Sequence, residues 1–199
     1  MIVVFSTLYF LLQHVPFREA VERTPSAIDR VVPFVPSAIY VYLSLWALMP
    51  LVSLLQDTRD GVFSYYKTIA FAFVCGFAIF LFWPMSCFRP EPPPGADPVY
   101  CFLMRIDRNL NAWPSLHAAF AVIGVAAWPG MEGSARFNGW LRLGLGVWAA
   151  AIMLAALLTK QHLCGDVIAG ALLGLASHAL LRKTNWRQPP NPRMRGNDG

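Results

Sequence analysis

Residues 111–119 read Asn-Ala-Trp-Pro-Ser-Leu-His-Ala-Ala, and they set polar side chains at the mouth of an apolar segment. The notable polar residues are Asn111, Ser115 and His117. Ionisable side chains at membrane depth are costly and tend to be functional, so His117 is either a packing residue or a chemically active one. The second stretch that bears on this choice is Thr-Lys-Gln-His-Leu-Cys-Gly-Asp at residues 159–166.

The composition indicates an integral membrane protein. Hydrophobic residues make up 56% of the 199 residues and charged residues only 14%, whereas an ordinary soluble domain carries about 25% charged residues. The net charge of +5 would suit a nucleic-acid partner, but the excess lies between Arg182 and Arg195, beside an apolar segment. Basic residues in that position indicate the cytoplasmic side of a membrane. We therefore expect a membrane and a lipid as partners, and no nucleic acid.

Six segments approach the length of about 20 apolar residues that a membrane-spanning helix needs. The first is the least secure, because it is short and contains His14 and Pro16. The sequence thus predicts an all-α integral membrane protein, a six-transmembrane-helix bundle. Residues 1–184 would form one transmembrane domain that also carries the site, and residues 185–199 a basic, disordered cytoplasmic tail. The six segments are residues 2–17, 31–56, 61–83, 114–129, 139–158 and 166–181.

An even number of spans places both ends of the chain on one side, which the basic tail indicates is cytoplasmic. Residues 18–30, 84–113 and 159–165 then all emerge on the opposite face. The proline-rich, charged stretch 84–113 cannot cross hydrocarbon, because its backbone would be unpaired there. We expect a bacterial inner-membrane protein whose polar loops face the periplasm.

His162 and Asp166 are four residues apart, so on a helix that begins at Gln161 their side chains would share one face. A carboxylate there would accept the imidazole N–H and leave the other ring nitrogen unprotonated. That is the state of a nucleophilic histidine. His117 on the same surface could then protonate a leaving oxygen as a general acid. Two histidines and one carboxylate suit phosphoryl transfer through a phosphohistidine.

A phosphoryl group is negatively charged, so cations and hydrogen-bond donors should surround it. Arg89 can hold phosphate oxygens in a bidentate fork, whereas Lys160 acts as a point charge. Ser115 and the backbone N–H groups after Pro114 would add donors if a helix begins there, because helix N-termini favour anions. Weaker candidates are Arg105 and Arg108.

The sequences Pro-Ser-Leu-His at 114–117 and Thr-Lys-Gln-His-Leu-Cys-Gly-Asp at 159–166, with Arg89-Pro90 upstream, resemble the type 2 phosphatidic acid phosphatase superfamily. Its members are integral membrane lipid phosphatases and phosphotransferases. Asn111, the Leu in Pro-Ser-Leu-His and the Thr-Lys-Gln-His run at 159–162 are most similar to the inositol phosphorylceramide synthase-like branch. The resemblance implies a six-helix catalytic domain without metal ion or cofactor. It also implies His162 as nucleophile, Asp166 as its partner, His117 as acid and Arg89 as phosphate ligand.

The chain departs from the family pattern at three positions. Phe82 stands where the family's first motif has a lysine, and Ala155 and Ala156 stand where its third motif has Ser-Arg. Two customary phosphate cations are therefore missing, and we expect Lys160 to replace one of them. The departures bear on the phosphate contacts and the substrate more than on the type of reaction.

The expected activity is hydrolysis of a phosphomonoester or diphosphate lipid. An alternative is transfer of a phospho-headgroup to another lipid, as in inositol phosphorylceramide synthase-like proteins. Two further classes remain open: a haem- or metal-binding membrane protein that uses His117 and His162 as ligands, and a non-catalytic scaffold or transporter with a phosphate-binding vestibule.

Several other residues receive structural interpretations. His14 and His178 are expected to be packing residues. Gly170 and Gly174 form a Gly-x-x-x-Gly pattern that permits close helix approach. Cys87 and Cys101 share the loop opposite the cytoplasm, where an oxidising compartment could allow a disulfide, and the sequence leaves both the disulfide and two free thiols open.

Overall fold

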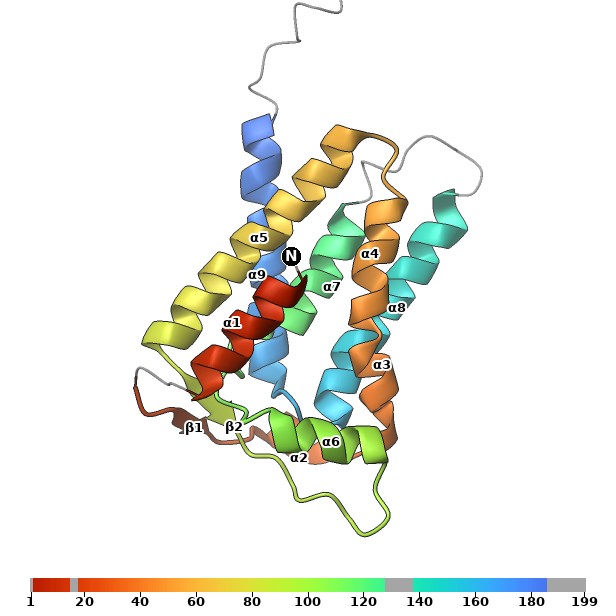
Figure 1. Cartoon of the computed structure of the whole chain (residues 1–199). Helices are drawn as coiled ribbons and strands as arrows, with labels where there is room; N and C mark the ends of the chain where they lie inside the picture. Colours follow the sequence, from red (N-terminus) through yellow and green to blue (C-terminus); the bar gives the residue numbers. More distant parts are fainter. Residues whose placement is uncertain (1, 15–17, 128–137, 186–199) are drawn as a thin grey trace, which may run out of the picture.

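The computed structural model describes residues 2–14, 18–127 and 138–185, and these residues are mostly helical (Figure 1). The basic segment 185–199 expected to be a tail lies outside the described residues, apart from Asn185. The elements are α1 (Ile2–His14), β1 (Val21–Arg23), α2 (Ala27–Val31), the 3-10 helix η1 (Pro36–Ala38), α3 (Ile39–Leu43), α4 (Leu45–Leu54), α5 (Arg59–Phe82), β2 (Met85–Cys87), α6 (Pro98–Ile106), α7 (Leu116–Ala126), α8 (Asn138–Leu158) and α9 (Cys164–Asn185).

Four helical segments among the described residues are long and apolar enough to cross a membrane, which supports a membrane protein. The six-span prediction is met only in part. Helix α1 has 13 residues and α7 has 11, so at 1.5 Å per residue each is about 20 Å long or less, against a hydrocarbon core of about 30 Å. The four long segments are Pro36–Leu54, Arg59–Phe82, Gly139–Leu158 and Cys164–Arg182.

Helix α7 lies at the centre of the bundle and contacts α4, α5, α8 and α9. It begins after Ser115, whose side-chain oxygen accepts a hydrogen bond from the Ala118 backbone N–H and so caps the first turn. Most of its residues are small or apolar and buried. This cap fixes the position of His117 in the first turn.

Helix α9 approaches α7 so closely that two of its positions require glycine. A Cβ built on Gly170 would lie 2.0 Å from the Ser115 carbonyl oxygen, and one built on Gly174 would lie 2.5 Å from the Ala119 carbonyl oxygen. Both distances are far below van der Waals contact. The Gly-x-x-x-Gly pattern therefore serves backbone packing, as expected, and it holds α7 against α9.

The polar segments gather at one end of the bundle, where Figure 1 shows β1, β2, α2 and α6 below the long helices. Strand β1 pairs in parallel with β2, with Arg23 opposite Cys87. Lys160, in the connection between α8 and α9, bonds to backbone carbonyls of residues 29 and 32. Residues 18–30, 84–113 and 159–165 thus share one end of the molecule, as the sequence predicts.

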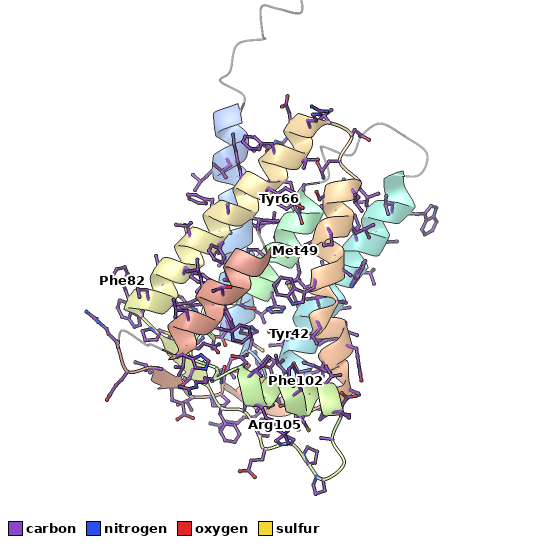
Figure 2. All side chains as sticks on the ribbon, viewed as in Figure 1. Tyr42, Met49, Tyr66, Phe82, Phe102 and Arg105 are labelled. Carbon is purple, nitrogen blue, oxygen red and sulfur yellow. The ribbon has the colours of Figure 1, made fainter. Side chains whose placement is uncertain are left out.

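Helix α6 lies across this end of the bundle (Figure 1). It begins at Pro98, and the Asp97 side chain caps it by accepting from the Val99 and Tyr100 N–H groups. In Figure 2, Phe102 extends toward the long helices and Arg105 extends away from them. The apolar face of α6 therefore lies over the ends of the long helices.

All four cysteines are free in the structure. The buried Cys87 thiol donates to the Gln161 carbonyl at 3.3 Å, whereas the Cys101 thiol contacts the Ala96 carbonyl. The disulfide considered between Cys87 and Cys101 is thus not formed, because each thiol is held by a different part of the chain.

Candidate active site

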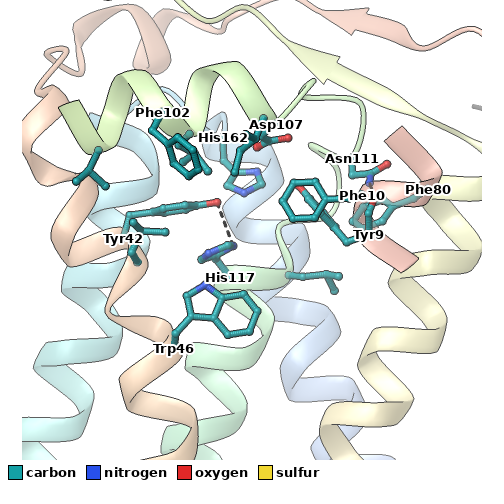
Figure 3. Close-up of a pocket in the computed structure, with 15 residues that line it drawn as sticks. Tyr9, Phe10, Tyr42, Trp46, Phe80, Phe102, Asp107, Asn111, His117 and His162 are labelled. Atoms are coloured by element: carbon teal, nitrogen blue, oxygen red, sulfur yellow. Dashed lines mark hydrogen bonds between the residues drawn. The ribbon is translucent and has the colours of Figure 1, made fainter. Parts of the chain in front are cut away.

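A cavity of about 270 Å³ lies at the polar end of the bundle, between α1, the α3–α4 junction, α6 and α7. Figure 3 shows aromatic rings around most of its wall, with two histidines among them. Its polar lining residues are Asp107, Asn111, His117 and His162, besides the Tyr9 and Tyr42 hydroxyls. The aromatic lining residues are Tyr9, Phe10, Tyr42, Trp46, Phe80 and Phe102.

The structure brings His117 and His162 together. His117 comes from the first turn of α7, and His162 comes from the short connection between α8 and α9. Their ring centroids are 6.2 Å apart and the ring planes are inclined by 49°. Because a ring nitrogen in hydrogen-bond contact with a substrate atom lies about 3 Å from it, both rings can reach one small tetrahedral group between them.

The environment of His162 defines which of its nitrogens is basic. Its Nδ1 lies 2.9 Å from the Ala112 carbonyl oxygen. A carbonyl only accepts hydrogen bonds, so Nδ1 carries the proton and Nε2 has the free lone pair. Burial lowers the pKa of His162 to about 4, and the nearby positive charge of Arg89 acts in the same direction. His162 is therefore neutral, with a basic Nε2, at neutral pH.

The predicted hydrogen bond between His162 and Asp166 is wrong. Helix α9 begins at Cys164, not at Gln161, so His162 precedes the helix and the i, i+4 relation does not apply. The fully buried Asp166 carboxylate instead accepts from the Leu163 N–H at 2.8 Å and forms an ion pair with Arg23. The Ala112 carbonyl takes the place expected for Asp166 beside the imidazole, and Asp166 holds the start of α9.

Arg23 was not among the residues predicted from sequence. It reaches Asp166 because the parallel pairing of β1 with β2 brings residues 21–23 to the start of α9. The guanidinium also lies over Gly165, where a Cβ would be 2.8 Å from an Arg23 nitrogen. No local spacing links positions 23 and 166, so only the folded chain reveals this contact.

Arg89 lies behind the cavity wall in an ion pair with Asp107. Its Nη2 is 2.9 Å from the Asp107 carboxylate and its Nη1 is 3.1 Å from the Asp107 carbonyl oxygen. Both side chains are less than a tenth exposed. Burial alone would raise the pKa of Asp107, but Arg89, with hydrogen bonds from Asn109 and Gln13, lowers it. Arg89 is thus a charged neighbour of the cavity that is already paired.

The two other predicted phosphate contacts are used within the protein. The Lys160 ammonium donates to the Asp29 carbonyl at 2.9 Å and to the Val32 carbonyl. Ser115 is fully buried and caps α7. Neither residue lines the cavity, because Lys160 binds the end of α2 and Ser115 caps the start of α7. Arg105 and Arg108 are exposed at the surface.

Two cavity residues were not singled out in the sequence. Asp107 accepts a hydrogen bond from the Gln13 side chain of α1, and Tyr42 contacts His117. The pairing of Asp107 with Arg89 could have been suspected from their opposite charges within one loop. Tyr42 gave no signal beyond a hydroxyl within an apolar segment. Asn111, which the sequence did single out, lines the cavity and donates to the Tyr9 carbonyl at 3.3 Å.

The fold and the cavity define a class: an α-helical membrane protein with a pair of histidines in an aromatic cavity at one end of its bundle. Within the described ranges, no group of three or more His, Cys, Asp or Glu side chains is placed to hold a metal ion. Comparison with protein-family models, curated proteins and solved structures found no match to this chain. Its function is therefore inferred from the residues and geometry of the cavity.

Proposed function

We propose that the protein is an integral membrane lipid phosphatase that hydrolyses a phosphomonoester or diphosphate lipid through a phosphohistidine. The observation that carries the proposal is the hydrogen bond from His162 Nδ1 to the Ala112 carbonyl, at 2.9 Å. It leaves a basic Nε2 on a histidine that lines the cavity beside His117. The motif resemblance to the type 2 phosphatidic acid phosphatase superfamily supports the same reaction.

In the proposed reaction, His162 Nε2 attacks the phosphorus atom and the bond to the leaving oxygen breaks. His117 is neutral in the free site, and the negative charge of the bound phosphate favours its protonation on both ring nitrogens. It then gives its Nε2 proton to the leaving oxygen, so an alcohol or a phosphate departs. The neutral His117 then accepts a proton from water, whose oxygen attacks the phosphohistidine. Inorganic phosphate is released and both histidines return to their starting states.

Arg89 supplies positive charge to this reaction without lining the cavity. Its charge contributes to the lowered pKa of His162, so its field reaches the imidazole. The same field favours a phosphoryl group beside that ring, and the Asp107 carboxylate opposes it in part, since Asp107 acts on the pKa of His162 in the other direction. Asp107 holds the guanidinium by two contacts and so fixes where this charge lies.

The cavity wall supports a lipid as substrate. Aromatic and aliphatic side chains form most of it, and they come from α1, from the α3–α4 junction and from α6. The α3–α4 segment belongs to a helix long enough to span the membrane. An apolar chain in this setting would gain the free energy of contact with apolar surface, while the reacting group lies at the histidines.

Transfer of a phospho-headgroup to another lipid is the second candidate, and the apolar wall is the observation that favours it. A phosphohistidine among such side chains is shielded from bulk water. An alcohol group of a second lipid could then resolve the intermediate in place of water. The chemistry on His162 is the same in both cases.

The test is a turnover assay on a panel of radiolabelled lipid phosphates, with and without an acceptor lipid. An alkaline quench preserves phosphohistidine for detection. We expect wild-type protein and the exposed control His14→Ala to form it, and His162→Ala to form none. Released phosphate would identify a phosphatase, and labelled acceptor lipid a phosphotransferase. Activity in His162→Ala, or reversible loss of activity with EDTA, would show that the proposed mechanism is wrong.

A further inference from the structure

Tyr42, on α3, makes two contacts with His117. Its hydroxyl oxygen lies 3.1 Å from His117 Nδ1, the contact drawn as a dashed line in Figure 3. The two rings are also stacked, with centroids 3.9 Å apart and planes inclined by 16°. Tyr42 is only 4% exposed, so water does not compete for its hydroxyl from outside the cavity.

Counting the hydrogen-bond partners of Tyr42 and His117 indicates which of them donates in the Tyr42–His117 hydrogen bond when His117 is neutral. His117 Nε2 is buried and has no hydrogen-bond partner among the described residues. If Tyr42 donates to Nδ1, one group is left without a partner, the Nε2–H. If Nδ1–H donated to Tyr42, both the tyrosine proton and the Nε2 lone pair would be left without one. Buried polar groups without partners are costly, so donation by Tyr42 is favoured.

A hydroxyl group both donates and accepts hydrogen bonds. When His117 is neutral in the free site, the Tyr42 O–H donates to Nδ1. When His117 is protonated on both nitrogens, Nδ1–H donates to the Tyr42 oxygen after rotation of the hydroxyl proton. After Nε2 has given its proton to the leaving oxygen, Nδ1–H still donates to Tyr42 and the Nε2 lone pair can accept a proton from water. The contact with Tyr42 therefore persists in every state, and Nε2 points away from Tyr42 in all of them.

We propose that Tyr42 is a positioning residue that holds Nδ1 of His117 and so keeps Nε2, which gives and then regains the proton, aimed at the leaving oxygen throughout the cycle. The inference rests on the proposed function, and it assigns a role to a residue outside the sequence motifs. Tyr42 acts through His117 and does not itself exchange a proton with the substrate.

The backbone around Tyr42 is held firmly enough for this role. Ser44, at the junction of α3 and α4, accepts a hydrogen bond from the Trp148 indole of α8 at 2.8 Å. The same hydroxyl donates to the Val41 carbonyl at 2.6 Å. These two bonds connect the last turn of α3 to α8. The backbone that carries Tyr42 is therefore held in place beside His117.

The experiment compares Tyr42→Phe with Tyr40→Phe, a control on the same helix whose side chain is 55% exposed. Phenylalanine keeps the stacked ring and removes only the hydroxyl. For a lipid phosphate with an alkoxide leaving group, we expect kcat to fall roughly 5- to 10-fold in Tyr42→Phe, with KM unchanged and Tyr40→Phe like wild type. For a nitrophenyl phosphate, which needs no proton on departure, we expect less than a twofold change.

A double-mutant cycle with His117→Ala separates positioning from a general structural effect. Once His117 is absent, Tyr42→Phe should cause no further loss. Additive losses in the double variant, or an equal loss on both leaving groups, would overturn the proposal.

A second readout does not depend on turnover. Nitrogen-15 NMR of labelled histidine reports which ring nitrogen bears the proton, and the His117 signals are assigned by their absence in His117→Gln. We expect an Nε2–H tautomer in the wild type and a mixture of tautomers in Tyr42→Phe. The same tautomer in both proteins would overturn the role of Tyr42. A lack of turnover on every lipid phosphate, with the NMR result as expected, would overturn the proposed function instead.

Discussion

The protonation state of His162 is the residue-scale property with the clearest consequence for activity. Its pKa of about 4 lies below the ordinary histidine value of 6.5, chiefly because the ring is buried. As the proposed nucleophile, His162 must be neutral, so we expect the acid side of the kcat/KM profile to fall at about pH 4 and not near 6.5. An NMR titration of His162 measures the same midpoint directly, and a midpoint near 6.5 would contradict it.

The lowered pKa of His162 also predicts the direction in which the free energy of unfolding changes with pH. The folded state binds the His162 proton less readily than the unfolded chain does, so the unfolded chain takes up the proton first as the pH falls. The contribution of His162 to the free energy of unfolding is complete above about pH 6.5 and declines as the pH drops toward 4. We therefore expect the free energies of unfolding of wild type and His162→Gln, measured by denaturation across this range, to approach each other at low pH. A constant difference between them would contradict the assignment.

The sequence pointed to His117 and His162 as candidate site residues, because ionisable groups at membrane depth are energetically costly and tend to be functional. It did not identify their immediate partners. Ala112 contributes a backbone carbonyl, which has no side-chain signature. Tyr42 reaches His117 across a separation of 75 residues. Asp166 was given the wrong partner because the helix start was placed three residues too early, at Gln161 and not at Cys164.

At the scale of elements, the contact between α7 and α9 depends on glycine. Gly170→Ala would drive a methyl group against the Ser115 carbonyl, and overpacking of this kind costs about 1–3 kcal/mol. We expect a lower melting temperature in detergent and a loss of activity, because Ser115 caps the helix turn that carries His117. Gly144→Ala on α8 is the matched control, since a Cβ there meets nothing within 4 Å. Equal melting temperatures for the two variants would contradict this packing argument.

The pairing of β1 with the start of α9 gives a second prediction. Arg23→Gln leaves the buried Asp166 carboxylate without its cation, which we expect to cost about 2 kcal/mol, less than for a wholly buried pair because Arg23 is 30% exposed. Arg30→Gln is the control, since Arg30 lies nearby on α2 and is exposed. Thermal unfolding in detergent compares the two. A melting temperature for Arg23→Gln equal to that of Arg30→Gln would show that the ion pair contributes nothing.

The long helices were predictable and the short ones were not. Apolar runs near 20 residues located α5, α8 and α9 to within a few residues. The run at 31–56 was taken as one span, but α2 ends at Val31 and the membrane-length segment begins only at Pro36. Pro33 and Pro36 interrupt the helix here, because the residue before a proline avoids the helical conformation. Helix α7 begins late for a different reason, since Ser115 is its cap.

At the scale of the whole molecule, the grouping of polar loops predicts a labelling pattern. Glu19 and Glu91 are exposed at the end that holds the cavity, and Asp60 is exposed at the other end, where α5 begins. In a background with the four native cysteines replaced by serine, Glu19→Cys and Glu91→Cys should react with a membrane-impermeant maleimide from one side. Asp60→Cys should react only from the other side.

Labelling of all three positions from one side would contradict the arrangement of the bundle in the membrane. Same-side labelling of Glu19→Cys and Glu91→Cys alone would leave the arrangement intact and identify which compartment the cavity faces. We expect that compartment to be the periplasm, since the basic segment after Arg182 favours the cytoplasm. Permeabilised vesicles, in which every exposed thiol reacts, provide the control for thiols that are simply buried.

The ion pair between Arg23 and Asp166 also sets an order of events during synthesis. The two residues are 143 positions apart, and ribosomes build the chain from its N-terminus. Residues 18–32 therefore leave the ribosome long before their partners at 160–166 exist. Until the start of α9 is made, the first polar loop lacks the contacts of Arg23 and Asp29 with that segment, and the cavity lacks His162. A chain that stops after Leu158 should consequently remain sensitive to protease within residues 18–32, whereas the whole chain resists.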